Sequence, residues 1–122
     1  MTAAATSRVL ATTMAHLESA YTLACAAAGS ELPSPWANSA MSIHLASAAL
    51  SVHVGACVPA AERRDCLTAL RAAQACLAAL PGEHGLPLVE VALVRGWIAS
   101  ALADAESRQA HRYRHHAPRH RH

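Results

Sequence analysis

The chain of 122 residues contains no Phe and no Lys, and aromatic residues make up only 3% of it. The apolar fraction of 53% therefore comes mainly from Ala, Leu and Val. Ala has the highest helix propensity and loses no side-chain entropy on folding, so this composition predicts a single all-α domain. Because each Ala buries little area, the helices must approach one another closely for the core to be stable.

The sequence also lacks the short motifs that mark common catalytic and cofactor sites. It has no Gly-x-Ser-x-Gly elbow, no glycine-rich phosphate loop and no His-Glu-x-x-His zinc motif. A di-iron bundle needs inward Glu-x-x-His pairs and covalent haem needs Cys-x-x-Cys-His, and neither pattern occurs. The eight acidic residues are scattered rather than paired for acid–base catalysis. We therefore expect a non-catalytic protein.

No segment has the pattern of an export signal or a membrane span. His16 and Glu18 interrupt the Ala-rich N-terminal stretch, whereas a signal peptide needs an unbroken apolar run. The most hydrophobic later stretch, residues 86–105, carries three charged side chains, which disfavour a membrane crossing. The expectation is a cytoplasmic protein whose four Cys are reduced thiols.

Three Gly- and Pro-rich breaks divide the chain into four segments with helical periodicity. Within each segment, apolar residues recur at alternating steps of three and four, which puts one apolar face on each helix. Short connections make consecutive helices antiparallel, so we expect an up-down-up-down four-helix bundle. The expected helices span residues 6–28, 35–55, 60–80 and 87–112, with the bundle domain over residues 1–107.

One local cluster in the expected bundle has the side chains of a soft-metal site. His53 and Cys57 are four residues apart near the end of the second segment, and Cys66 follows the turn into the third. In an antiparallel helix pair they would offer two thiolates and an imidazole to Zn²⁺ or Cu(I). Core packing is the alternative and the more common role, because free Cys is often a small buried residue.

The last 15 residues form a basic, His-rich tail that differs from the rest of the chain. Residues 1–107 hold all eight acidic residues and a net charge of −3, whereas residues 108–122 hold five Arg and five His. Clustered neutral imidazoles bind Zn²⁺, Ni²⁺ or Cu²⁺ by chelation, so the tail is the preferred metal site. Its candidate ligands are His111, His115, His116, His120 and His122.

A second interpretation of the tail is contact with a polyanion. Its Arg side chains can neutralise phosphates and its Tyr can stack on a base, which points to nucleic acid or an acidic partner protein. The candidate residues are Arg108, Arg112, Tyr113, Arg114, Arg119 and Arg121. The remaining alternative is a flexible, solvated tail that keeps an apolar bundle in solution.

The bundle itself offers one further partner, a second copy of the chain. The mean hydropathy of the whole chain is slightly positive, which favours burial of an Ala-rich face against another molecule. We therefore expect a homodimer and no membrane partner.

Overall fold

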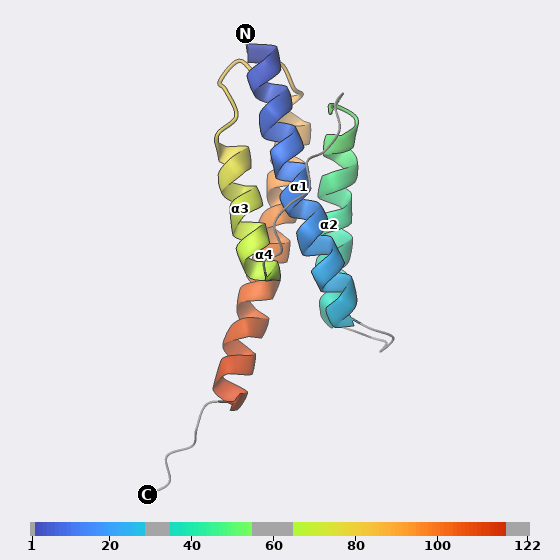
Figure 1. Cartoon of the computed structure of the whole chain (residues 1–122), viewed down its shortest axis with the longest axis vertical. Helices are drawn as coiled ribbons and strands as arrows, with labels where there is room; N and C mark the ends of the chain where they lie inside the picture. Colours follow the sequence, from blue (N-terminus) through green and yellow to red (C-terminus); the bar gives the residue numbers. More distant parts are fainter. Residues whose placement is uncertain (1, 29–34, 55–64, 117–122) are drawn as a thin grey trace, which may run out of the picture.

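The computed structural model describes residues 2–28, 35–54 and 65–116, and four helices account for most of them. The helices are α1 (Thr2–Ala28), α2 (Pro35–Ser51), α3 (Cys66–Ala78) and α4 (Leu88–His116). They pack side by side with their axes roughly aligned (Figure 1). The expected all-α four-helix bundle is confirmed.

The order of the helices around the bundle differs from the expected up-down-up-down arrangement. Within the described residues α1 contacts α2 and α3, and α4 contacts the same two helices, whereas α2 and α3 do not touch. Cys66 donates its thiol to the Ala20 carbonyl at 3.6 Å, and Cys76 donates to the Val9 carbonyl at 3.5 Å. Helix α3 therefore runs antiparallel to α1, although consecutive hairpins would make these two helices parallel.

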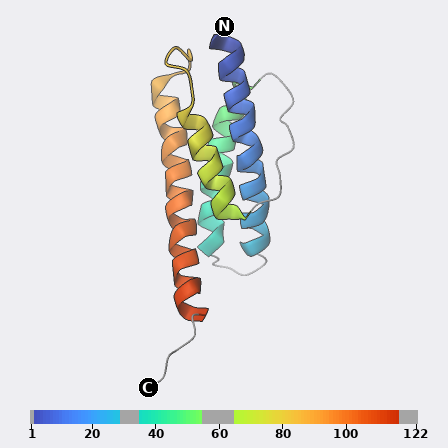
Figure 2. The same ribbon diagram turned by 60° about the vertical axis from the view of Figure 1, so that its left-hand side comes forward.

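This connectivity follows from the segment between α2 and α3. Figures 1 and 2 show α2 ending at the end of the bundle where α1 begins, and α3 starting toward the opposite end. The last turn of α2 and the first turn of α3 therefore lie toward opposite ends of the bundle, whereas an up-down-up-down bundle would have them at the same end. All four contacting helix pairs are antiparallel, and the two parallel pairs, α1 with α4 and α2 with α3, lie on the diagonals.

All four helices differ in their bounds from the sequence prediction, and α1 begins at Thr2 rather than 6. Helix α2 ends at Ser51 rather than 55, and α4 continues to His116 rather than 112. Helix α3 begins at Cys66 rather than 60, and residues 60–64 lie outside the described residues. The cause of this start is Asp65, whose carboxylate accepts hydrogen bonds from the Thr68 backbone N–H at 2.7 Å and from its hydroxyl at 2.9 Å. This N-cap satisfies a backbone donor that a helix start leaves unpaired.

The core consists of a few large aliphatic side chains separated by many Ala. Four large side chains are completely buried, with 0% of their surface exposed: Leu17, Ile43, Leu70 and Ile98. Fully buried Ala positions on all four helices fill the space between them: Ala20, Ala24, Ala46, Ala69, Ala73 and Ala101. Such small side chains let helix axes approach closely. None of the described helices combines the length and apolarity of a membrane span.

Replacing the N-cap of α3 is expected to destabilise the bundle moderately. Asp65→Ala removes both hydrogen bonds to Thr68 and should lower the free energy of unfolding by about 1 kcal/mol, whereas Asp65→Ser keeps an acceptor and should stay close to wild type. The Thr68 bonds lower the pKa of Asp65, so their contribution is present above the unfolded pKa of about 3.9 and is lost as pH falls through the lowered value. Urea unfolding at neutral and acid pH measures both effects, and equal stability of the Ala and Ser variants at neutral pH would contradict the capping role.

Candidate functional site

The C-terminal end of α4 extends past the helices that pack against the rest of it. Ser39 donates to the Asp104 carboxylate at 3.4 Å, and the Arg108 guanidinium lies 5.4 Å from the centre of the Trp36 ring. Since α2 begins at Pro35, Arg108 is level with its first turn. The eight residues from 109 to 116 add about 12 Å of helix at 1.5 Å per residue, and they project beyond the bundle in both ribbon views (Figures 1 and 2).

Three of the five predicted metal-binding His lie in this projecting part of α4. His111, His115 and His116 are within the helix, although their side chains are outside what the structure describes. His111 and His115 are separated by four residues of unbroken helix, the spacing at which helix residues are neighbours. His120 and His122 lie outside the described residues.

The predicted polyanion-binding residues are divided between the bundle and the projecting end. Arg108 stacks on Trp36, a cation–π contact that holds its guanidinium against the bundle. Arg112, Tyr113 and Arg114 lie within α4 without described side chains, and the two last Arg of the chain are outside the described residues. The structure therefore describes only one of the six candidate side chains, that of Arg108, and does not define a polyanion-binding surface.

The structure does not bring together His53 and Cys66, the two described residues of the predicted internal cluster with Cys57. His53 lies in the turn after α2, where its Nε2 is 2.9 Å from Oε1 of Glu90 in the first turn of α4. Cys66 is the first residue of α3, bonded to the Ala20 carbonyl toward the other end of the bundle. Cys57 lies outside the described residues. The predicted cluster requires α2 and α3 to be antiparallel neighbours, and they are not.

The environment of Cys66 also disfavours metal binding by its thiolate. The side chain is buried, with 8% of the residue exposed. Burial, together with a smaller effect of the nearby Asp65 carboxylate, raises the pKa of the Cys66 thiol to about 11. A thiol with this pKa stays protonated at neutral pH, and metal ions bind the deprotonated form. Cys66 therefore fills the alternative role considered for it, core packing.

A surface group that the sequence did not predict joins α1 and α2. The Tyr21 and His44 rings have centroids 5.9 Å apart, and both residues are exposed. A hydrogen bond with Cys25 is the main cause that raises the pKa of Tyr21, with smaller effects of the Cys25 charge and of burial. Tyr21 lies on the apolar stripe of its segment, so periodicity alone assigns it to the core, yet it is 39% exposed.

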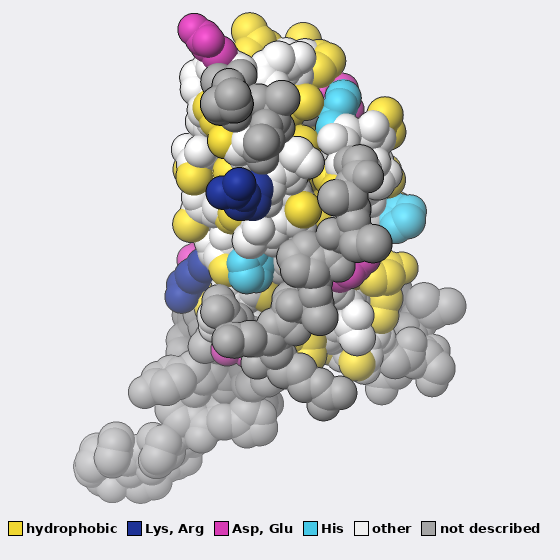
Figure 3. Space-filling view, turned by 45° about the horizontal axis from the view of Figure 1, so that its top comes forward, with side chains coloured by type: hydrophobic (Ala, Val, Ile, Leu, Met, Phe, Trp, Pro, Cys, Tyr) yellow, Lys and Arg dark blue, Asp and Glu magenta, His cyan; other side chains and the backbone are white. Residues whose placement is uncertain are grey.

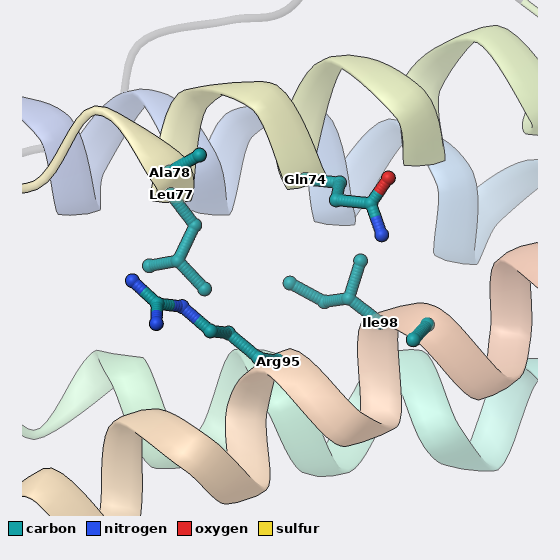
Figure 4. Close-up of a pocket in the computed structure, with 6 residues that line it drawn as sticks. Gln74, Leu77, Ala78, Arg95 and Ile98 are labelled. Carbon is teal, nitrogen blue, oxygen red and sulfur yellow. The ribbon is translucent and has the colours of Figure 1, made fainter.

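A cavity of about 230 Å³ lies between α3 and α4. Its walls are mostly apolar, with Leu77 and Ile98 extending toward each other from the two helices (Figure 4). Gln74 and Arg95 are its polar lining residues, and Arg95 reaches from α4 toward the end of α3 in the same view. The cavity has the volume for a few water molecules or a small apolar group, and its lining contains no carboxylate, thiol or imidazole.

In the part of the chain with described side chains, no three His, Cys, Asp or Glu residues gather closely enough to hold a metal ion. Comparison with models of protein families, with curated proteins and with solved structures found no match to this chain.

Proposed function

We propose that this protein is a small non-catalytic binding protein that captures a transition-metal ion, Zn²⁺, Ni²⁺ or Cu²⁺, through His residues at the projecting end of α4. The observation that supports this proposal most is the continuation of α4 to His116. It puts His111 and His115 in one unbroken helix at a separation of four residues. Helical zinc sites use His pairs at this spacing to supply two ligands to one ion.

The remaining His of the tail complete the coordination in this proposal. Two imidazoles leave two positions open on a four-coordinate ion, and His116, His120 and His122 supply further donors. The interleaved Arg residues repel a cation and hold the affinity to a moderate range. Only neutral imidazole binds metal, so the affinity decreases as the pH is lowered.

Moving one His by a single residue tests whether the helical spacing matters. In the double variant Ala110→His/His111→Ala the number of His is unchanged, but the imidazole moves about 100° around the helix and loses its partner four residues away. We expect its affinity for Zn²⁺ and Ni²⁺, measured by calorimetric titration, to fall by about tenfold because one ligand is lost. This fall corresponds to about 1.4 kcal/mol of binding free energy.

A matched exchange beyond the helix provides the control. Arg119→His/His120→Arg also moves one imidazole by one residue, in the segment after Pro118. Because Pro cannot continue a helix, no fixed spacing is broken there and the affinity should be unchanged. Equal affinities of both variants and wild type would contradict a helical His pair. The number of His in the tail, and not their spacing, would then determine the affinity.

Contact with nucleic acid or an acidic protein is the alternative proposal for the tail. The stacking of Arg108 on Trp36 weighs against it, because this guanidinium already has a partner in the bundle. Polyanion binding would weaken with salt and strengthen at acid pH, whereas metal binding survives moderate salt and weakens at acid pH.

A further inference from the structure

Helix α2 packs against α1 and α4 and has no Asp, Glu or Arg in its 17 residues. Its core face is formed by Ile43, Ala46 and Leu50. The rest of its surface carries exposed apolar side chains: Met41 is 58% exposed and Leu45 is 38% exposed. A solvent-facing helix surface normally carries charged residues, so an uncharged one requires an explanation. Hydrophobic and uncharged side chains also make up most of the described surface in the space-filling view (Figure 3).

The exposed apolar residues of α2 form a second stripe on the side opposite the core. Met41, Leu45 and Ala48, followed by Val52 in the turn after the helix, are separated by steps of four, three and four. This spacing is the one by which two helices pack knobs into holes. All four residues are exposed, Val52 at 78%. We name Met41, Leu45, Ala48 and Val52 the outer stripe.

The outer stripe is self-complementary in an antiparallel pairing. The midpoint between Met41 and Val52 coincides with the midpoint between Leu45 and Ala48, and it lies between residues 46 and 47. A twofold axis at this point puts Met41 opposite Val52 of a second copy and Leu45 opposite Ala48. On each side of the axis the large Leu45 side chain thus meets the small Ala48 side chain of the other copy. No like charges face each other across the axis.

The surface of α4 beside the middle of the outer stripe is also uncharged, because Glu90 and Asp104 lie toward its two ends and Arg95 lines the cavity next to α3. The contacts of Ser39 with Asp104 and of His53 with Glu90 set the register of the two helices, so the centre of the outer stripe is level with Gly96. Leu93, one turn earlier, is 50% exposed. A Cβ added to Gly96 would meet nothing within 4 Å, so packing inside the bundle does not require this helix-weakening Gly. A helix of a second molecule could approach α4 more closely at Gly96, because Gly has no side chain.

We propose that the chain forms a twofold-symmetric homodimer in which the outer stripe of α2 packs antiparallel against its copy, flanked by Leu93 and Gly96 of α4. Helix α2 is about 25 Å long, and a face two helices wide covers about 500 Å² on each protomer. The total of about 1,000 Å² is the lower limit for a specific interface, so the dimer dissociates on dilution. The dimer does not involve the tail His and is independent of the metal proposal.

Sedimentation velocity of the full chain in EDTA, which removes metal-bridged species, tests the dimer. Wild type should show a monomer–dimer equilibrium. Leu45→Glu puts two carboxylates beside the axis and should weaken dimerisation on the order of 100-fold, the effect of an unpaired buried charge. Ala75→Glu adds the same charge to the exposed surface of α3 and should leave the equilibrium unchanged.

A mixing experiment tests the antiparallel register. Ala48→Lys alone should also weaken the homodimer, since two ammonium groups then lie beside the axis. In an equimolar mixture of Leu45→Glu and Ala48→Lys the carboxylate of one chain faces the ammonium of the other, and heterodimers should form. Wild type that stays monomeric at all concentrations, a Leu45→Glu variant that dimerises normally, or a mixture that stays monomeric would each overturn the proposal.

Discussion

Leu17→Ala is expected to lower the free energy of unfolding by about 2–5 kcal/mol, through lost burial and the cavity left behind. Leu17 is 0% exposed and belongs to the continuous core cluster. Many of its neighbours in that cluster are Ala, whose side chains have no rotamers with which to refill the space. The total stability of a small domain is about 5–15 kcal/mol, so one such truncation removes a large part of it.

Urea unfolding followed by circular dichroism measures this loss as a shift of the midpoint at constant slope. Leu88→Ala is the matched control, because Leu88 is 75% exposed at the start of α4. Its truncation should change the stability by less than about 0.5 kcal/mol. A similar loss in both variants would mean that the core is not centred on the buried stripes described above.

Ala69→Leu is expected to destabilise the bundle by about 1–3 kcal/mol, although Leu is nearly as good a helix former as Ala. Ala69 is 0% exposed on α3, three residues after the Cys66 thiol that reaches the Ala20 carbonyl of α1. The Cys66 Sγ atom is only one bond beyond Cβ, yet it reaches the Ala20 carbonyl on the backbone of α1. Helices α1 and α3 therefore lie close together. Three additional carbons do not fit between them without separating the helices.

Ala75→Leu makes the same change at an exposed position of α3 and should be nearly neutral. The pair of variants therefore separates the effect of packing from the effect of helix propensity. If Ala69→Leu were as stable as wild type, the buried Ala would not set the distance between α1 and α3, and the argument from an Ala-rich core would fail.

Helix content and buried faces could be predicted from the sequence because they depend on local properties. Composition and the three–four spacing indicated the helices, and Leu17, Ile43 and Ile98 are buried as their spacing requires. The order of the helices around the bundle could not be predicted in the same way. An apolar stripe specifies that a face is buried but not which helix covers it. The short break at residues 55–59 predicts that the helices on either side of it are antiparallel neighbours, and α2 and α3 are not.

The candidate sites depended on these two kinds of information unequally. The His53 and Cys66 site required a particular pair of neighbouring helices, so it failed when α2 and α3 proved to be diagonal. The pair of His111 and His115 required only that α4 continue, which is a local property of its sequence. The pairing of His53 with Glu90 could not be foreseen, because it depends on the contact between α2 and α4.

The most direct test of the proposed function is calorimetric titration of the full chain with Zn²⁺ and Ni²⁺, beside a variant in which all five tail His are replaced by Asn. The variant keeps every Arg and Cys and the internal His53. Metal capture at the end of α4 predicts micromolar or tighter binding by the wild type that is lost in the variant. Binding that the variant retains, or no binding by either protein, would contradict the proposal.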